Sequence, residues 1–400
     1  MSEQLSETTL TARPSAEISR MGSRALIAGV VGLALMAVGF MTARETFLQS
    51  YLIAFIFWIG ITLGSLAVLM IQYLSGGAWG LVSRRVLEAS TRTLPLMVLL
   101  FVPIALSLPE LYIWARPEAA ADHLIHEKAA YLNAPFFYAR AAFYFLVWGG
   151  LVFILNKWSK EQDEAAPQLP GPQDRRFRVL SGPGLVLYVL TATFMAVDWI
   201  MSLDPHWYST IFGILTMGGQ GLSTMAFTIL VLAALVKYQP MLSVADADKF
   251  HDLGKLMFAF VLLWAYFSVS QLLIIWSANL PEEVPFYLER LHGPWAPISI
   301  ALLIGQFVLP FLLLLSRGFK RNPRAVGRIA LGILVMRVVD IAWTIGPVFR
   351  EGSSLHWLDF ACVLGLGGIW MFLFFRNLGD RALVPVRDPY LKEALAHGGH

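Results

Sequence analysis

Ten runs of mostly apolar residues follow one another along this 400-residue sequence, each about as long as a membrane crossing. A helix needs ~20 apolar residues to cross the hydrocarbon core of a bilayer, where its backbone polar groups must pair within the helix. The sequence therefore predicts an all-α integral membrane protein with ten transmembrane helices. The predicted spans are 24–43, 49–74, 93–114, 135–156, 180–202, 211–237, 253–279, 295–316, 326–347 and 357–376.

The composition excludes an ordinary soluble protein. Hydrophobic residues make up 57% of the chain and charged residues 14%, against ~45–50% and ~25% in soluble domains. The net charge of +3 does not indicate nucleic-acid binding, because the basic residues sit in short loops between apolar runs. The single cysteine, Cys362, lies in an apolar run, so an intrachain disulfide and a cysteine-held iron–sulfur cluster are excluded.

The distribution of positive charge predicts the orientation of the chain. The N-terminal tail and every second loop hold 23 of the 30 Lys and Arg residues, and the opposite loops hold six. Cytoplasmic loops are the ones enriched in Lys and Arg. We therefore expect a cytoplasmic tail over 1–23, a transmembrane domain over 24–376 and a second cytoplasmic tail over 377–400.

The connecting segments are short, none longer than about 25 residues by the spans of this sequence. Partner proteins would therefore have to supply any extramembrane chemistry. The charged segment 157–179 is expected to be a flexible cytoplasmic link between two halves of the chain. Within the second span, Gly60 and Gly64 have the small-residue spacing that allows close helix packing, and we expect it to serve packing inside the protein.

Arg337 and Asp340 are the most unusual residues of the predicted spans. They lie three residues apart on one face of the ninth span, near the middle of the membrane. A charge at this depth costs several kcal/mol and normally faces the helix bundle with a partner. The pair fits two interpretations: an internal ion pair that fixes packing, and a proton relay or ligand-binding site.

Other polar residues gather in the predicted outer half of the membrane. Asp198 lies in the fifth span, and Asp204 and His206 follow in the turn after it. Asp204 precedes Pro205 and could simply form that turn. Arg140, Gln271 and Asp359 lie at similar depth in other spans, whereas the inner half is expected to be poor in ionisable groups. This asymmetry predicts a hydrated cavity open to the outside. No histidine lies mid-span, so a haem held between two spans is not expected.

The stretch from Asp198 to Gly213, DWIMSLDPHWYSTIFG, resembles the signature of the ActF-type polytopic subunit of bacterial alternative complex III. That complex is a quinol:cytochrome c oxidoreductase, and the subunit is a relative of the NrfD and polysulfide-reductase membrane subunits. The resemblance extends over the chain through its length, ten spans, cytoplasmic termini and the Arg/Asp pair in the ninth span. Only the sixteen-residue stretch is specific.

The resemblance implies two four-helix bundles, here about 49–202 and 211–347, with the first and last spans outside them. It also implies the bacterial inner membrane and several partners: a second polytopic subunit, a periplasmic iron–sulfur subunit and cytochrome c subunits. Haem c and iron–sulfur clusters would be held by those partners, and this chain would bind no cofactor of its own. The family's other polytopic subunit is the usual place of quinol oxidation, and this one is linked to a proton path or a quinone pocket. The motif residues are Asp198, Asp204 and His206, whose individual roles the resemblance leaves open.

Three functions remain open at the level of sequence. The first is a haem-free subunit of a quinol-oxidising complex, with a proton path or quinone pocket built from the polar residues above. The second is a structural scaffold whose buried charges only hold helices together. The third is a secondary transporter, although such proteins show Gly/Pro-broken helices that meet at the midplane, and here those residues are scattered.

Overall fold

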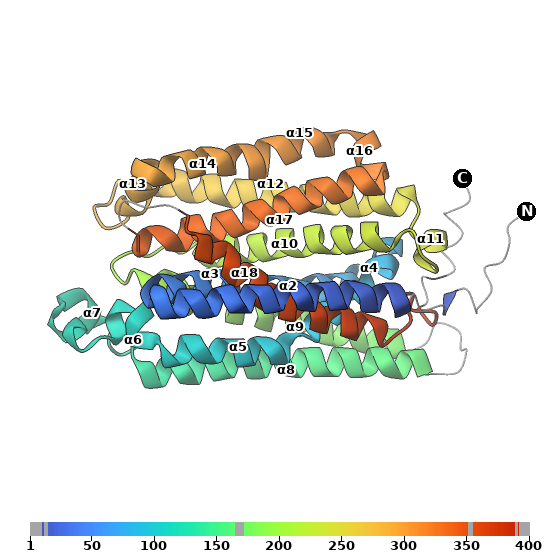
Figure 1. Cartoon of the computed structure of the whole chain (residues 1–400), viewed down its shortest axis with the longest axis horizontal. Helices are drawn as coiled ribbons and strands as arrows, with labels where there is room; N and C mark the ends of the chain where they lie inside the picture. Colours follow the sequence, from blue (N-terminus) through green and yellow to red (C-terminus); the bar gives the residue numbers. More distant parts are fainter. Residues whose placement is uncertain (1–9, 12–14, 165–171, 351–354, 389–390, 392–400) are drawn as a thin grey trace, which may run out of the picture.

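The computed structural model describes residues 10–11, 15–164, 172–350, 355–388 and 391. In this part of the chain the fold is all-α, with ten helices long and apolar enough to cross a membrane (Figure 1). The prediction of a polytopic membrane protein with ten spans is confirmed. The spans are Ser15–Thr42, Arg44–Ser75, Trp79–Leu106, Ala134–Glu164, Arg175–Leu203, Phe212–Leu235, Ala247–Ala278, Gly293–Leu315, Pro323–Val348 and Trp357–Gly379.

The third span differs most from its prediction. It begins at Trp79 rather than residue 93, because α4 (Ala78–Thr91) continues almost directly into α5 (Leu94–Leu106). Arg84, Arg85 and Glu88 lie in α4 and are nearly fully buried. A prediction from hydropathy treats each of these charges as unfavourable within the membrane. In the structure they pair with one another, so the helix carries them inside the protein.

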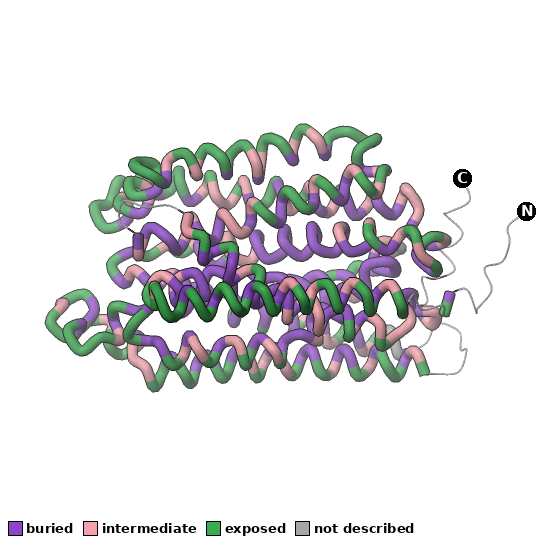
Figure 2. Tube along the Cα trace, in the orientation of Figure 1, coloured by how far each residue is buried: buried purple, intermediate pink, exposed green. Residues whose placement is uncertain are grey.

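Two helices form the centre of the molecule, α3 (Arg44–Ser75) and α10 (Phe212–Leu235). Figure 2 shows α10 buried along most of its length, and the apolar part of α3 is buried throughout. Gly64 on α3 lies directly against the backbone of α10 at Gln220, where a Cβ would not fit. Thr224 on α10 also donates a hydrogen bond to the Ile61 carbonyl oxygen at 3.2 Å. The Gly60–Gly64 spacing therefore serves packing inside the protein.

Two groups of helices flank this centre. On one side α3 packs with α4, α5 and α9 (Pro172–Trp199), and α9 packs with α8 (Ala134–Glu164). On the other side α10 packs with α12 (Ala247–Ala278) and α17 (Pro323–Ile345), and the eighth span completes that group. The eighth span begins with η4 (Gly293–Trp295) and continues through α14 (Ala296–Leu302), the π-helical segment η5 (Leu303–Val308) and α15 (Leu309–Leu315).

The first and last spans, α2 (Ser15–Thr42) and α18 (Trp357–Gly379), lie against each other outside these two groups. Gly29 and Gly32 on α2 meet Gly368 and Gly365 on α18 so closely that a Cβ at any of the four would contact the opposite helix. Glycine allows such an approach because it has no side chain. The α2–α18 pair then packs through α18 onto α3.

The short helices mark the two ends of the molecule. Figure 1 places α7 (His123–Glu127) and α13 (Pro285–Leu291) at one end, and α11 (Met241–Val244) and α16 (Arg317–Arg321) at the other. α2 begins and α18 ends at the α11–α16 end, as an even number of spans requires. The predicted link 157–179 is shorter than expected, because α8 runs to Glu164 and α9 begins at Pro172; residues 165–171 lie outside the described part.

Candidate functional site

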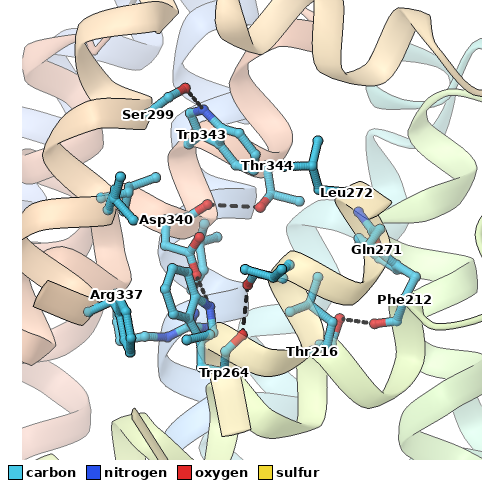
Figure 3. A pocket seen from close by; sticks show the side chains of 18 of the residues that line it. Phe212, Thr216, Trp264, Gln271, Leu272, Ser299, Arg337, Asp340, Trp343 and Thr344 are labelled. Atoms are coloured by element: carbon cyan, nitrogen blue, oxygen red, sulfur yellow. Dashed lines mark hydrogen bonds and ion pairs between the residues drawn. The ribbon is translucent and has the colours of Figure 1, made fainter. Parts of the chain in front are cut away.

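A cavity of about 710 Å³ lies among α10, α12, η5 and α17, beside Arg337 and Asp340, the charged pair of the ninth span (Figure 3). Its walls are mostly apolar and aromatic, and its polar groups are few. Pockets of ~300–1,000 Å³ with apolar walls and a few convergent polar groups are the usual form of a small-molecule site. Arg337 and Asp340 both line the cavity, and each is more than nine-tenths buried.

The carboxylate of Asp340 contacts side chains from three elements, α12, η5 and α17. Its Oδ2 accepts hydrogen bonds from Trp264 Nε1 at 3.1 Å and from Gln306 Nε2 at 3.2 Å, and it forms an ion pair with the Arg337 guanidinium. Every side-chain hydrogen bond that this carboxylate accepts within the described part of the chain goes to Oδ2. Oδ1 is therefore left for a ligand or a proton.

The position of Arg337 depends on α10. Its Nε donates to Ser223 Oγ at 3.3 Å, and its guanidinium lies over Gly219, where a Cβ would come within 2.6 Å of Arg337 Cζ. α10 thus supplies a hydrogen-bond acceptor and an empty space one turn apart. The two features hold the guanidinium beside Asp340 in an interior where an unpaired charge would be strongly destabilising.

Gln306 reaches Asp340 from a π-helical turn. π-helical turns are rare and frequently occur at functional sites, because they rotate the following side chains relative to a regular helix. Gln306 is fully buried, and its Oε1 is an acceptor for which the described residues provide no donor. A buried acceptor without a donor is unfavourable in a purely structural role.

The end of the cavity nearest α13 carries a second set of polar groups. Gln271 lies between Ser209, whose hydroxyl donates to Gln271 Oε1 at 3.3 Å, and the Tyr287 hydroxyl, which accepts from Gln271 Nε2 at 3.4 Å. Burial raises the pKa of Tyr287 to about 12, so its hydroxyl stays protonated. Gln271 thus shares one cavity with Arg337 and Asp340, although the sequence places it nearer the outer side of the membrane than that pair.

Arg290 fixes α13 over this end of the cavity. It donates to the carbonyl oxygens of Trp343 at 3.2 Å and of Thr344 at 2.7 Å, at the C-terminal end of α17. Burial lowers the pKa of Arg290 to about 10, which leaves the guanidinium charged at neutral pH. Cations are favourable near helix C-termini, where the unpaired carbonyls point outward.

One side of the cavity reaches the apolar outer surface of the molecule. Its lining includes Tyr266, Val269 and Leu273 on α12 and Leu303 on η5, which are 65%, 52%, 48% and 56% exposed. In a membrane-spanning protein such side chains face lipid. A ligand could therefore pass between the cavity and the hydrocarbon interior of the bilayer.

Asp198 lies in the other helix group and not in this cavity. Its carboxylate is fully buried and receives Arg140 through two bonds, Nε–Oδ2 at 2.8 Å and Nη2–Oδ1 at 3.0 Å. The Tyr144 hydroxyl donates to Oδ2 at 2.6 Å. Both oxygens are engaged, so this arrangement is typical of an ion pair that joins α8 to α9.

Asp359 is held in the same manner at the start of α18. Arg350 donates to both of its oxygens at 2.8 Å, and Ser50 on α3 donates to Oδ1 at 2.7 Å. Asp359 also accepts the backbone N–H of His356 and so caps its own helix. Like the Arg140–Asp198 pair, these contacts are typical of an ion pair with a structural role in helix packing.

Asp204 and His206 lie at the exposed end of the molecule beyond α9. His206 Nε2 is 2.8 Å from Asp122 Oδ2, and its backbone N–H donates to Asp204 Oδ1 at 3.1 Å. The hydrogen bond with His206 is the main cause of a lowered pKa at Asp122. These contacts join the α7 loop to the turn after α9, and neither Asp204 nor His206 lines the cavity.

The expectation that the inner half is poor in ionisable groups is wrong. Glu88 on α4 is 2% exposed and lies in a buried network with Arg84, Arg85 and Ser159. Arg84 also bonds to Asp388 at 2.9 Å, which fastens the segment after α18 to this end. The prediction of a cavity open to the outer side depended on a scarcity of ionisable groups in the inner half, and the Glu88 network removes that basis. The observed cavity instead opens toward the side of the helix bundle.

Sequence reasoning missed several residues of the cavity. Trp264 and Ser223 line the cavity, whereas Gln306 and Gly219 contact the Arg337–Asp340 pair, and none of the four has a sequence pattern that links it to Asp340. The π-helical turn that places Gln306 has no simple sequence signal.

In the comparison with known proteins, no protein-family model matches the sequence, and no curated protein matches it.

Proposed function

We propose that this protein is a haem-free membrane subunit of a respiratory quinol:cytochrome c oxidoreductase of the alternative complex III type, and that its cavity binds the quinone head group. The observation that carries the proposal is the cavity itself. A buried carboxylate with one unengaged oxygen lies at the end of an apolar pocket that reaches the lipid-facing surface. The resemblance of Asp198–Gly213 supports the assignment to this class of complex.

The geometry suits the chemistry of a quinol. A quinol dissolves in the bilayer through its isoprenoid tail and carries two hydroxyl groups on an aromatic ring. Its oxidation to quinone releases two electrons and two protons. In the proposal, Asp340 accepts the protons one at a time at Oδ1 and passes each on before the next. Arg337, Trp264 and Gln306 hold the carboxylate in place at Oδ2.

The electrons have to leave through other subunits. We propose that haem c and iron–sulfur clusters on cytochrome c subunits and on a periplasmic iron–sulfur subunit receive them. A second polytopic subunit would complete the assembly in the bacterial inner membrane. Both termini of this chain would lie in the cytoplasm, at the α11–α16 end, in agreement with the enrichment of Lys and Arg in the loops there.

The test is Asp340→Asn in the intact complex purified from its native membranes. Amide and carboxylate have nearly the same shape, but the amide cannot accept the proton, and a general base is worth about 10²–10⁴-fold in rate. We expect quinol-dependent cytochrome c reduction to fall by about that factor while the complex keeps its haem content. The control is Glu161→Gln, which alters an exposed carboxylate paired with Arg176 far from the cavity.

A scaffold role is the second candidate, because the Arg140–Asp198 and Arg350–Asp359 pairs have the contacts of packing devices. A photoreactive quinone analogue separates the two. The pocket is supported if the analogue labels residues of α12 and η5 and if excess quinone prevents that labelling. If an assembled Asp340→Asn complex turns over fully and no such labelling occurs, the scaffold role is the one that remains.

A further inference from the structure

A group of positive side chains gathers where α12 begins, at the end of the molecule opposite α13. Lys320 and Arg317 come from α16, which packs against α12, and His251 and Lys255 come from α12 itself. Figure 1 shows α16 beside the start of α12. Lys320 packs over Gly254, which lies between His251 and Lys255 on α12, and Arg317 lies three residues before Lys320 on α16.

Lys320 is the most constrained of them. The residue is 8% exposed, and its methylene stem fills the space over Gly254, where a Cβ would lie 2.9 Å from Lys320 Cγ. The ammonium group lies 5.8 Å from the centre of the Phe258 ring. Within the described part of the chain this ammonium group forms no ion pair and donates no hydrogen bond. Burial, together with the nearby Lys255 ammonium, lowers the pKa of Lys320.

The carboxylates nearby are already engaged. Three aspartates open α12, and each pairs with one cation: Asp246 with Lys249, Asp248 with Arg321 and Asp252 with Lys255. They leave no acidic partner for Lys320 or Arg317 among the described residues. The corner therefore holds an uncompensated positive charge around a largely buried lysine, which favours an anionic ligand.

The apolar surface beside this corner indicates what kind of anion fits. Phe319, Leu315 and Leu312 are 44%, 55% and 59% exposed and run from α16 along α15. Phe258 and Phe311 form an aromatic contact between α12 and α15, with ring centres 5.5 Å apart. A ligand that fits both parts has a negative head at the level of α16 and hydrocarbon chains along α15.

We propose that this corner is a binding site for an anionic phospholipid of the leaflet at the α11–α16 end, with its phosphate between Lys320 and Arg317 and its acyl chains over α15 and α12. Basic pockets between transmembrane helices on the positively charged side of a membrane protein recognise such head groups. This site is remote from Asp340, and the proposal does not depend on the function of the cavity.

The experiment compares the wild-type chain, in its native assembly, with Lys320→Met. Samples are delipidated in detergent, then given phosphatidylglycerol or phosphatidylcholine with the same acyl chains. Lipid retention is read by native mass spectrometry and thermal stability by melting temperature. One interfacial cation is worth about 1 kcal/mol toward an anionic lipid, so we expect Lys320→Met to retain about fivefold less phosphatidylglycerol. Phosphatidylcholine retention should be low and equal in both.

The matched control is Lys237→Met, which removes one exposed cation at the same end of the molecule. It should retain phosphatidylglycerol as the wild type does. If Lys320→Met fails to assemble, Arg317→Ala on the exposed side of α16 gives the same readout. Equal retention of phosphatidylglycerol by the wild type and the α16 variant, or equal retention of the two lipids, overturns the proposal. Stabilisation by inorganic phosphate to the same degree overturns the lipid assignment.

Discussion

Gly219 on α10 faces the guanidinium of Arg337 on α17, and a Cβ at Gly219 would lie 2.6 Å from Arg337 Cζ. We predict that Gly219→Ala pushes the guanidinium away from Asp340 and Ser223. Overpacking of this kind costs about 1–3 kcal/mol, and quinol oxidation by the complex should fall with it. Melting temperature and turnover of the purified complex are the measurements.

The control for that variant is Gly332→Ala on α17 itself, where a Cβ meets nothing within 4 Å. It should keep both stability and turnover. Wild-type behaviour of Gly219→Ala would mean that the guanidinium position is unimportant.

Trp264 tests the hydrogen bonds to Asp340 separately from the carboxylate. Trp264→Phe keeps an aromatic ring but removes the N–H that donates to Oδ2 at 3.1 Å. Without this bond the carboxylate loses part of its alignment in the cavity, and because a misplacement of ~1 Å can cost about a hundredfold in rate, we expect turnover to drop by up to about that factor. Trp276→Phe on the same helix, 75% exposed, should have little effect. Equal kinetics in the two variants would contradict a role for the indole.

A substitution of Glu88 tests the buried charge network of α4, which includes Arg84 and Arg85 and lies outside the cavity. Glu88→Gln leaves Arg84 and Arg85 without their shared carboxylate. Removing one partner of a buried ion pair costs about 3–5 kcal/mol. We expect a large loss of thermal stability, whereas Glu110→Gln, in the exposed Arg44–Glu110 pair, should cost about 0–1 kcal/mol. Similar melting temperatures for the two variants would show that the network is not stabilising.

The link between Asp122 and His206 should depend on pH. The folded-state pKa of Asp122 is lowered, chiefly by the hydrogen bond with His206. A lowered carboxyl pKa stabilises the folded state above the unfolded pKa of about 3.9, and that contribution disappears as the pH falls through the lower folded pKa. The protection of the α7 backbone amides against hydrogen exchange, relative to the intrinsic exchange rate at each pH, should therefore fall in this acid range. His206→Ala should move this loss of protection to higher pH, and an unchanged profile would exclude the link.

The spans could be predicted from sequence because hydropathy is a local property, and the Arg337–Asp340 pair because its partners are three residues apart. The partners of Asp198, and the contact of Asp359 with Ser50, could not. Arg140 is 58 residues from Asp198, and Ser50 is 309 residues from Asp359. Nothing in one sequence reports which distant helices become neighbours. The buried Glu88 network was missed for the related reason that compensation between charges is a tertiary property.

The glycines of α2 and α18 do carry a signal that was readable. Gly29 and Gly32, and likewise Gly365 and Gly368, are three residues apart and so share a helix face. Gly60 and Gly64 have the commoner spacing of four residues. The spacing alone, however, names no partner helix.

The contact between these glycine faces has a consequence for synthesis. α2 is translated first of the ten spans and α18 last, yet each fits most closely against the other. While the eight spans between them are made, Gly29 and Gly32 lack the α18 glycines that they contact in the folded protein. The α2 glycine face must wait for nearly the whole chain to be made, and ribosome-bound chains that end before α18 will keep it accessible.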